Sequence, residues 1–278
     1  MLIEIKNVTH IYDQEQSIKA LDNVNLEIDE HEFIGIVGHT GSGKTTLVQM
    51  FNSLIEPTSG TIYVDGINTT EKKADLKHVR QTVGLVFQYP EHQLFEETIY
   101  DDVAFGPRNL NLDKDEVDKR VKVALDLVGL DFEEFKDRSP FNLSGGQQRR
   151  VAIAGVLAMR PRVLILDEPT AVLTQNESAA LFELIDTLRA RGVGIIYISH
   201  KLEEIERLAD RITIIRDGEL VGRYAADKLS KDDMARLMVG RELDSLYPSI
   251  PKPGPKPGPK PGPAPSAEHV PALAVSGL

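Results

Sequence analysis

One stretch, residues 38–46, constrains the fold of this chain more than any other. It reads Gly-His-Thr-Gly-Ser-Gly-Lys-Thr-Thr and fits the pattern G-x-x-x-x-G-K-[ST] of phosphate-binding loops. An apolar segment, residues 33–37, precedes the stretch, and apolar residues follow it at helical spacing. The sequence therefore predicts a buried strand, a phosphate loop and a helix in succession, which is the context in which this motif binds a nucleoside triphosphate.

The chemistry of such a loop rests on its glycines and on the helix that follows. Glycine lets backbone N–H groups turn inward around an anion, and the helix N-terminus adds partial positive charge. Lys44 would reach the β- and γ-phosphates, and the Thr45 hydroxyl would ligate Mg²⁺. The predicted nucleotide-binding residues of the loop are Gly38, His39, Thr40, Gly41, Ser42, Gly43, Lys44, Thr45 and Thr46.

The composition excludes several classes of protein. The formal net charge of −11 argues against a general nucleic-acid binder, since such domains usually carry a basic face. Disulfides, thiol catalysis and thiolate metal sites are excluded because the chain has no cysteine. No run approaches the roughly 18 uninterrupted apolar residues of a membrane-spanning helix. We therefore expect a globular nucleotide-binding protein.

Predicted strands alternate with predicted helices, which indicates an α/β fold with a parallel core sheet and a small antiparallel sheet. The strands expected in the antiparallel sheet are 2–8, 18–28 and 59–66, and those expected in the parallel core are 83–87, 163–166 and 195–198. Between them, residues 89–112 are expected to be irregular because they contain Pro90 and Pro107, and residues 131–142 to form an acidic loop.

Polar side chains stand where three of the apolar strands stop, and active residues gather at the carboxyl ends of parallel strands. Asp167 would bind Mg²⁺, and Glu168 would polarise the water that attacks the γ-phosphate. Gln88 would sit near the metal and that water. His200 would hydrogen-bond the γ-phosphate, although a lone histidine at a strand end is more often structural.

A second strong signal is Leu-Ser-Gly-Gly-Gln at residues 143–147, which opens a predicted helix. Ser144 can cap that helix, while Gly145 and Gly146 leave N–H groups bare, and Gln147 follows them. This is a second anion site at a helix N-terminus. Two γ-phosphate sites in one chain suggest that one of them serves the nucleotide of a neighbour.

The phosphate loop, Gln88, the 143–147 motif, Asp167-Glu168 and His200, in that order, resemble the ATP-binding cassette (ABC) ATPases over residues 1–248. The resemblance implies a phosphate-loop NTPase core, a small antiparallel β subdomain and a helical subdomain that carries the 143–147 signature. It implies that two cassettes pack head to tail, each ATP lying between one phosphate loop and the other signature. It also implies roles for single residues: Tyr12 as the adenine platform, Gln88 at the loop facing a membrane partner, and His200 as the γ-phosphate switch.

The subfamily resemblance is divided. The phosphate loop, residues 88–95 and residues 104–107 look like the ATPases of energy-coupling-factor importers of vitamins and metal ions. Residues 167–174, 197–202 and 238–241 look instead like the ATPases of sugar and nucleoside importers. The sequence therefore reads as a mosaic that switches between residues 150 and 167.

One position departs from the family pattern. Cassettes often carry aspartate where this chain has Thr174, and that aspartate helps to couple the two sites of the dimer. Thr174 with Glu177 forms a capping box for the helix that follows. Its structural role is therefore expected, while its part in communication between sites is open.

The composition changes at Pro248, where we expect the ATPase domain to end. Residues 249–271 are rich in proline and glycine and predict a linker or tail. Residues 272–278 resemble residues 2–8 in pattern, which fits either the start of a second, absent repeat or a simple tail.

The leading hypothesis is an ATP-hydrolysing importer subunit at the cytoplasmic face of the membrane, bound peripherally to a transmembrane subunit and to a second cassette, identical or not. The alternatives are a sugar or nucleoside importer ATPase, a soluble cassette without a membrane partner, and an inactive module that holds ATP without turnover. ATP and Mg²⁺ are the expected cofactors, and no nucleic-acid partner is expected.

Overall fold

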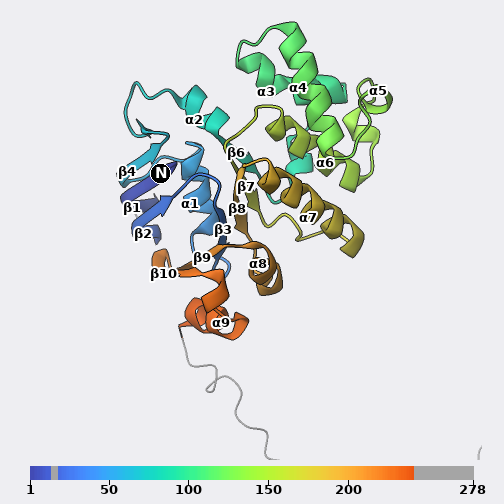
Figure 1. The fold of residues 1–278 in the computed structure, drawn as a ribbon. Coiled ribbons are helices and arrows are strands. Elements are labelled where there is room, and N and C mark those ends of the chain that lie inside the picture. The colour runs from blue at the N-terminus through green and yellow to red at the C-terminus, as the bar shows by residue number, and fades with distance from the viewer. Residues whose placement is uncertain (14–17, 241–278) are drawn as a thin grey trace, which may run out of the picture. The chain divides into compact units, whose positions relative to one another are not determined.

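Two β-sheets organise the part of the chain that the computed structural model describes, residues 1–13 and 18–240 (Figure 1). The six-stranded sheet has the spatial order β10 (Glu219–Ala225), β9 (Arg211–Arg216), β3 (Phe33–Val37), β8 (Gly194–Ile198), β7 (Val163–Asp167) and β6 (Val83–Val86). The four-stranded sheet has the order β2 (Ile18–Ile28), β1 (Ile3–Asp13), β4 (Ser59–Val64) and β5 (Ile67–Asn68). The six-stranded sheet is parallel except for β10, and the smaller sheet is antiparallel. The predicted α/β class and its two sheets are confirmed.

Helices cover the sheets and connect the parallel strands. In chain order they are α1 (Lys44–Phe51), α2 (Leu76–Thr82), α3 (Ile99–Asn109), α4 (Lys114–Leu127), α5 (Phe132–Phe135), α6 (Gly145–Leu157), α7 (Gln175–Ala190), α8 (Leu202–Leu208) and α9 (Lys231–Val239). Short 3₁₀ turns lie at Pro90–Gln93, Pro140–Asn142 and Ala226–Lys228. Helices α3, α4 and α6 pack against one another, and in Figure 1 α3, α4 and α5 lie across the core sheet from β1, β2 and β4. This group is the predicted helical subdomain.

The core sheet is buried on both faces because its central strands are apolar throughout. Phe33 and Tyr197 pack into the cluster shared with α3, α4, α6 and α7, while Ile34 and Ile196 pack into the cluster shared with α1 and the antiparallel sheet. Successive side chains of a strand point to opposite faces, so a fully apolar strand belongs between two layers.

Two segments differ from the sequence prediction. Residues 89–112 were expected to be irregular, yet they contain α3, whose N-cap Thr98 accepts a 3.1 Å hydrogen bond from the Asp101 N–H. Pro107 lies inside α3, two residues before its end at Asn109, so the hydrogen bond that it removes belongs to the last turns of the helix. The expected acidic loop at 131–142 contains α5, capped by Asp131, and a 3₁₀ turn.

The predicted end of the ATPase domain at residue 248, the linker at 249–271 and the repeat-like segment at 272–278 all lie outside the described residues. Within the described part, no helix is long and apolar enough to cross a membrane.

Candidate nucleotide site

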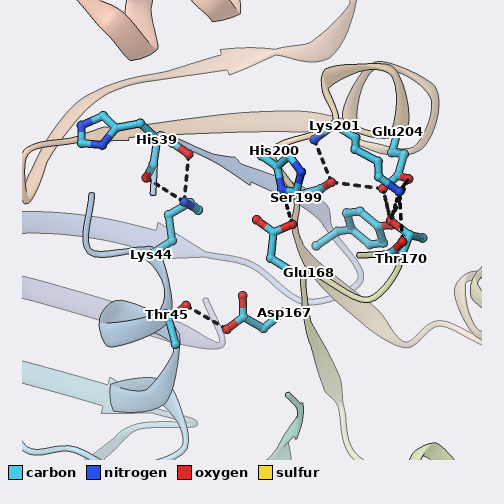
Figure 2. Close-up of polar contacts among 12 residues, drawn as sticks. His39, Lys44, Thr45, Asp167, Glu168, Thr170, Ser199, His200, Lys201 and Glu204 are labelled. Atoms are coloured by element: carbon cyan, nitrogen blue, oxygen red, sulfur yellow. Dashed lines mark hydrogen bonds and ion pairs between the residues drawn. The ribbon is translucent and has the colours of Figure 1, made fainter. Parts of the chain in front are cut away.

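The site is assembled by four neighbouring parallel strands. β3, β8, β7 and β6 lie in that order, so the segments that follow them meet at one edge of the sheet. The phosphate loop follows β3, His200 follows β8, Asp167 and Glu168 end β7, and Gln88 follows β6. The structure thus brings to one edge the residues that the sequence placed there (Figure 2).

The phosphate loop is shaped by glycines that this chain's own packing requires. Gly43 has a φ of 100°, and a Cβ on it would lie 2.3 Å from the backbone oxygen of Ala20. A Cβ on Gly38 would lie 2.2 Å from the backbone oxygen of Ile215. No side chain caps the N-terminus of α1. The N–H groups that open α1 are therefore available to an anion.

Lys44 lies inside the loop. Its ammonium donates hydrogen bonds to the carbonyl oxygens of Gly38, at 2.8 Å, and His39, at 3.0 Å (Figure 2). Burial lowers the pKa of Lys44, while the nearby Glu168 and Asp167 carboxylates oppose that shift. A buried cation held only by carbonyls gains most from an anion, so a phosphate group is the natural partner.

Thr45 and Asp167 form the candidate metal pair. The Thr45 hydroxyl donates a 2.9 Å hydrogen bond to Oδ2 of Asp167. The other oxygen, Oδ1, is buried without a hydrogen-bond partner among the described residues. Burial raises the pKa of Asp167, a shift that the Thr45 hydrogen bond opposes. A buried carboxylate oxygen without a donor fits a cation.

These residues fit Mg²⁺ better than a metal that needs a full protein cage. The described part of the chain has no cluster of three or more His, Asp or Glu that could hold a metal ion. Mg²⁺ usually takes one or two protein ligands and completes its shell with phosphate oxygens and water. Thr45 and Asp167 would hold the ion, which would neutralise charge on the phosphates. Gln88, the third predicted ligand, stands at the same sheet edge, and no hydrogen bond joins its side chain to the other two within the described residues.

Glu168 and His200 face each other across the ends of β7 and β8. A 2.7 Å hydrogen bond joins His200 Nδ1 to Glu168 Oε2 (Figure 2). Glu168 adopts a φ of 48°, and its N–H donates to the Ile198 oxygen of the neighbouring strand at 2.9 Å. The His200 side chain is 60% exposed and that of Glu168 only 16%, so the histidine lies on the solvent side of the carboxylate. This pair suits a base that is oriented by a second group.

Arg149 is a functional candidate that the sequence analysis missed. Its guanidinium Nη2 donates a 2.6 Å hydrogen bond to the Gln88 carbonyl oxygen, which ties α6 to the segment after β6. The residue is only 4% exposed, and burial lowers its pKa. Its signal in the sequence was a charged residue at helical spacing from Ala152 and Ile153, which are both buried.

Tyr12 lies at the end of β1, with its ring 60% exposed. Its hydroxyl shares a 3.0 Å hydrogen bond with Thr46 Oγ1, and His10 packs edge-on against its ring at 4.6 Å between centroids. The ring is therefore held beside α1 with much of its surface free. Its predicted role as an adenine platform remains a prediction.

The signature opens α6. Ser144 caps the helix and forms a complete capping box with Gln147, while a Cβ on Gly145 would meet no atom within 4 Å. Within the described residues, no hydrogen bond or ion pair joins 144–147 to the phosphate loop at 38–46. The two predicted anion sites of this chain are thus not joined to each other. The predicted capping box of Thr174 with Glu177, at the start of α7, is also present.

Known proteins with similar sequences also belong to a family of ATP-binding transporter subunits. A family profile described as "ABC transporter" matches residues 21–171. The energy-coupling factor transporter ATP-binding protein EcfA2 of Clostridium perfringens is 52% identical over 224 residues, which cover 80% of this chain and 79% of that protein. EcfA2 of Clostridioides difficile is 51% identical over 240 residues, which cover 85% of this chain and 83% of that protein.

Solved structures agree. The structure of cbiO1 from Clostridium perfringens, described as part of the ABC transporter complex cbiONQ, matches with a TM-score of 0.71 and 34% identity over 88% of this chain and 94% of that one. A dimeric ATP-binding cassette, MJ0796, bound to ADP and Pi, matches with a TM-score of 0.72 and 33% identity over 81% of this chain and 99% of that one. A match of 224 residues extends past residues 150–167, so the likeness to energy-coupling-factor ATPases is not confined to the N-terminal part. The likeness of the later motifs to sugar and nucleoside importers stays a prediction.

Proposed function

Because this chain belongs to the ABC transporter family, as one of its ATPase cassettes, we propose that it is the ATP-hydrolysing subunit of an energy-coupling-factor importer. The observation that carries the proposal is the convergence of Lys44, Asp167, Glu168 and His200 at one edge of the core sheet (Figure 2). Relatives that are about half identical over four-fifths of the chain, and that are named as energy-coupling-factor ATP-binding proteins, support the transporter class.

Each group at this edge has a distinct task. The bare N-terminus of α1 and the Lys44 ammonium bind the β- and γ-phosphates. Thr45 and Asp167 would hold Mg²⁺, which would neutralise phosphate charge when bound. Glu168 accepts a proton from the attacking water, and His200 holds that carboxylate in place through their 2.7 Å hydrogen bond.

The signature serves a neighbouring cassette. Ser144–Gln147 are not joined to this chain's own phosphate loop, and an exposed helix N-terminus with space at Gly145 suits a phosphate that arrives from outside. A head-to-tail pair then completes two ATP sites. ATP closes the pair, and hydrolysis with loss of phosphate reopens it.

The surface beyond Gln88 is suited to a membrane partner. Tyr89 is 43% exposed and Phe95 57%, and Phe95 packs edge-on against the exposed Phe105 at 4.9 Å between ring centroids. Such aromatic side chains are typical of the centre of a protein interface. A transmembrane subunit that docks here would hold this chain peripherally at the cytoplasmic face of the membrane. Movement of the segment at Gln88 would then be passed to that subunit.

ATP turnover by the Glu168→Gln variant tests the proposal. Loss of the general base should lower kcat by about 10²–10⁴-fold while ATP binding remains, because Lys44 and the loop are unchanged. Glu183→Gln, an exposed glutamate on α7, is the matched control and should hydrolyse ATP at the wild-type rate. An unchanged kcat in Glu168→Gln would contradict the proposed mechanism.

A further inference from the structure

A buried carboxylate outside the nucleotide site joins the two segments that carry Glu168 and His200. It belongs to Glu204, in the first turn of α8, and its side chain is 12% exposed. No motif in the sequence singled it out. We propose that Glu204 is a positioning residue for hydrolysis, which fixes the distance between Glu168 and His200. The inference rests on the proposed function, because it assigns a role in the same reaction.

The first segment that Glu204 holds is the turn after Glu168. The Thr170 hydroxyl, in a residue that is 1% exposed, lies 2.7 Å from Glu204 Oε1 and 2.8 Å from Oε2. The turn itself is closed by a 3.1 Å hydrogen bond from the Ala171 N–H to the Glu168 oxygen. Movement of Thr170 would therefore move Glu168, whose left-handed backbone leaves it few other arrangements.

The second segment flanks His200 on both sides. The hydroxyl of Ser199, which is fully buried, donates to Glu204 Oε2 at 3.1 Å, and the Lys201 ammonium lies 3.3 Å from Oε1. The Lys201 N–H donates to the Ser199 hydroxyl at 3.0 Å, which closes the turn at His200. The residues before and after the histidine are thus both tied to one carboxylate (Figure 2).

Two further contacts bind the cluster together. The buried Tyr197 hydroxyl donates to Glu204 Oε2 at 2.8 Å, and burial raises the pKa of Tyr197, which keeps its proton in place. Lys201 also donates to the Thr170 carbonyl oxygen at 3.0 Å, so the two segments touch directly. A carboxylate has about four lone-pair positions, and Glu204 meets four different donors, so this acceptor is saturated.

The geometry separates Glu204 from ATP binding. No hydrogen bond or ion pair joins it to residues 38–46 in the described part of the chain, and its side-chain partners there come from β8 and from the segments after β7 and β8. Its removal should therefore change the chemical step and leave nucleotide affinity unchanged. A shift of about 1 Å in a catalytic group is enough to cost roughly 10²-fold in rate.

The test uses the full chain with the substitution Glu204→Gln. It keeps the shape of the side chain, removes its charge and replaces one acceptor oxygen by an amide donor. We expect kcat for Mg-ATP to fall by about tenfold to a hundredfold, with KM and nucleotide affinity near the wild-type values. Glu203→Gln is the matched control, since the Glu203 side chain is 72% exposed and its one ion pair within the described residues is with Lys231, at 3.6 Å. This control should leave kcat unchanged.

A double-substitution cycle separates positioning from general destabilisation. If Glu204 acts through the Glu168–His200 pair, Glu204→Gln should add little to the loss already caused by His200→Ala. The inference would be overturned if the loss of kcat in the double variant equalled the product of the two single losses. An unchanged kcat in a folded Glu204→Gln protein would also overturn it. If Glu204→Gln does not fold, Thr170→Val breaks the same link from the other segment and must give the same split between kcat and KM.

Amide hydrogen exchange distinguishes this inference from the proposed function. Glu204→Gln should speed exchange in 168–171 and 199–202 and leave 38–46 unchanged. If the wild type does not hydrolyse ATP, the proposed function fails while this exchange pattern still decides whether Glu204 holds the two segments. Unchanged exchange in both segments would overturn the inference whatever the wild-type rate.

Discussion

The helices α1 and α6 each present an N-terminus to a phosphate in the proposed function, and they do so in opposite ways. α1 has Gly43 as its N-cap, with no side-chain hydrogen bond, and buries the Lys44 ammonium at its start. α6 is closed by a full capping box between Ser144 and Gln147, and only its start, at Ser144 and Gly145, is exposed to solvent. The start of α6 is thus capped by a side chain, whereas no side-chain cap hydrogen bond is present at the start of α1 among the described residues.

Gly38 and Gly43 of the loop differ from Gly145 of the signature in the space that surrounds them. Gly43 and Gly38 are required by this chain itself, because a Cβ at either position would meet a backbone oxygen at 2.3 or 2.2 Å. At Gly145, as at Gly41 of the loop, a Cβ would meet nothing within 4 Å among the described residues, whereas at Gly146 it would lie 2.3 Å from Oε1 of Glu177. A glycine that its own fold does not need suggests a close approach from outside. The comparison thus assigns the loop to this chain's own nucleotide and the signature to a neighbour's.

Substitution of one glycine in each motif gives the largest expected effect. Gly43→Ala should destabilise the fold by about 3 kcal/mol, from left-handed strain and overpacking, and should abolish ATP binding. Gly145→Ala should leave the monomer as stable or stabilise it by roughly 0.5–1 kcal/mol, since alanine favours a helix. Denaturant unfolding and nucleotide binding measure both. Equal destabilisation by the two substitutions would break the contrast.

A smaller effect on stability is expected from Asp167→Asn, which removes the buried carboxylate charge beside the phosphate loop. The pKa of Asp167 is raised in the folded chain by burial, so its proton stabilises the fold below that pKa, and this contribution is lost as the pH rises through it. At neutral pH without Mg²⁺, Asp167→Asn should therefore raise Tm by about 2–4 °C for each kcal/mol relieved. Stabilisation by Mg-ATP should weaken in the same variant.

The exposed Asp186→Asn on α7 is the control for this experiment and should leave Tm unchanged. A lower Tm for Asp167→Asn at neutral pH, in the absence of Mg²⁺, would show that the buried, ionised carboxylate does not destabilise the fold, and would contradict this prediction.

The sequence predicted the parts of the molecule that local patterns encode. The phosphate loop, the strand ends at Asp167 and His200, the cap at Ser144 and the capping box at Thr174 each follow from neighbouring residues, and the structure places them as expected. Helix α3 was missed because Pro107 outweighed the start signal at Thr98, whose side chain caps the helix three residues before Asp101. A proline near the end of a helix removes one hydrogen bond and need not end the helix there. Treating every proline as a helix breaker therefore missed α3.

Contacts between distant segments were not predictable in the same way. Arg149 meets Gln88, and Glu204 meets Thr170, only because parallel strands and helix packing bring them together. Each is a charged residue with a hydrogen-bond partner dozens of positions away, although Glu204 also meets the nearby Tyr197, Ser199 and Lys201. Distant partners of this kind do not recur at a fixed spacing along the chain, so a single sequence does not show them.

The central claim is that this chain binds ATP with its own loop and completes the site with a neighbour's signature. The most direct test is the mass in solution of Glu168→Gln with and without Mg-ATP, since blocked hydrolysis should trap the closed pair. Ser144→Ala and Ser230→Ala, added to that variant, each remove a capping box and each cost about 1 kcal/mol, but only Ser144 belongs to the signature.

We expect Mg-ATP to convert Glu168→Gln from monomer to dimer, the added Ser230→Ala to leave this unchanged, and the added Ser144→Ala to weaken it. If the natural partner is a different cassette, the same shift should appear on mixing with that subunit. A protein that binds ATP yet stays monomeric alone and with that partner, or a dimer indifferent to Ser144, would contradict the account.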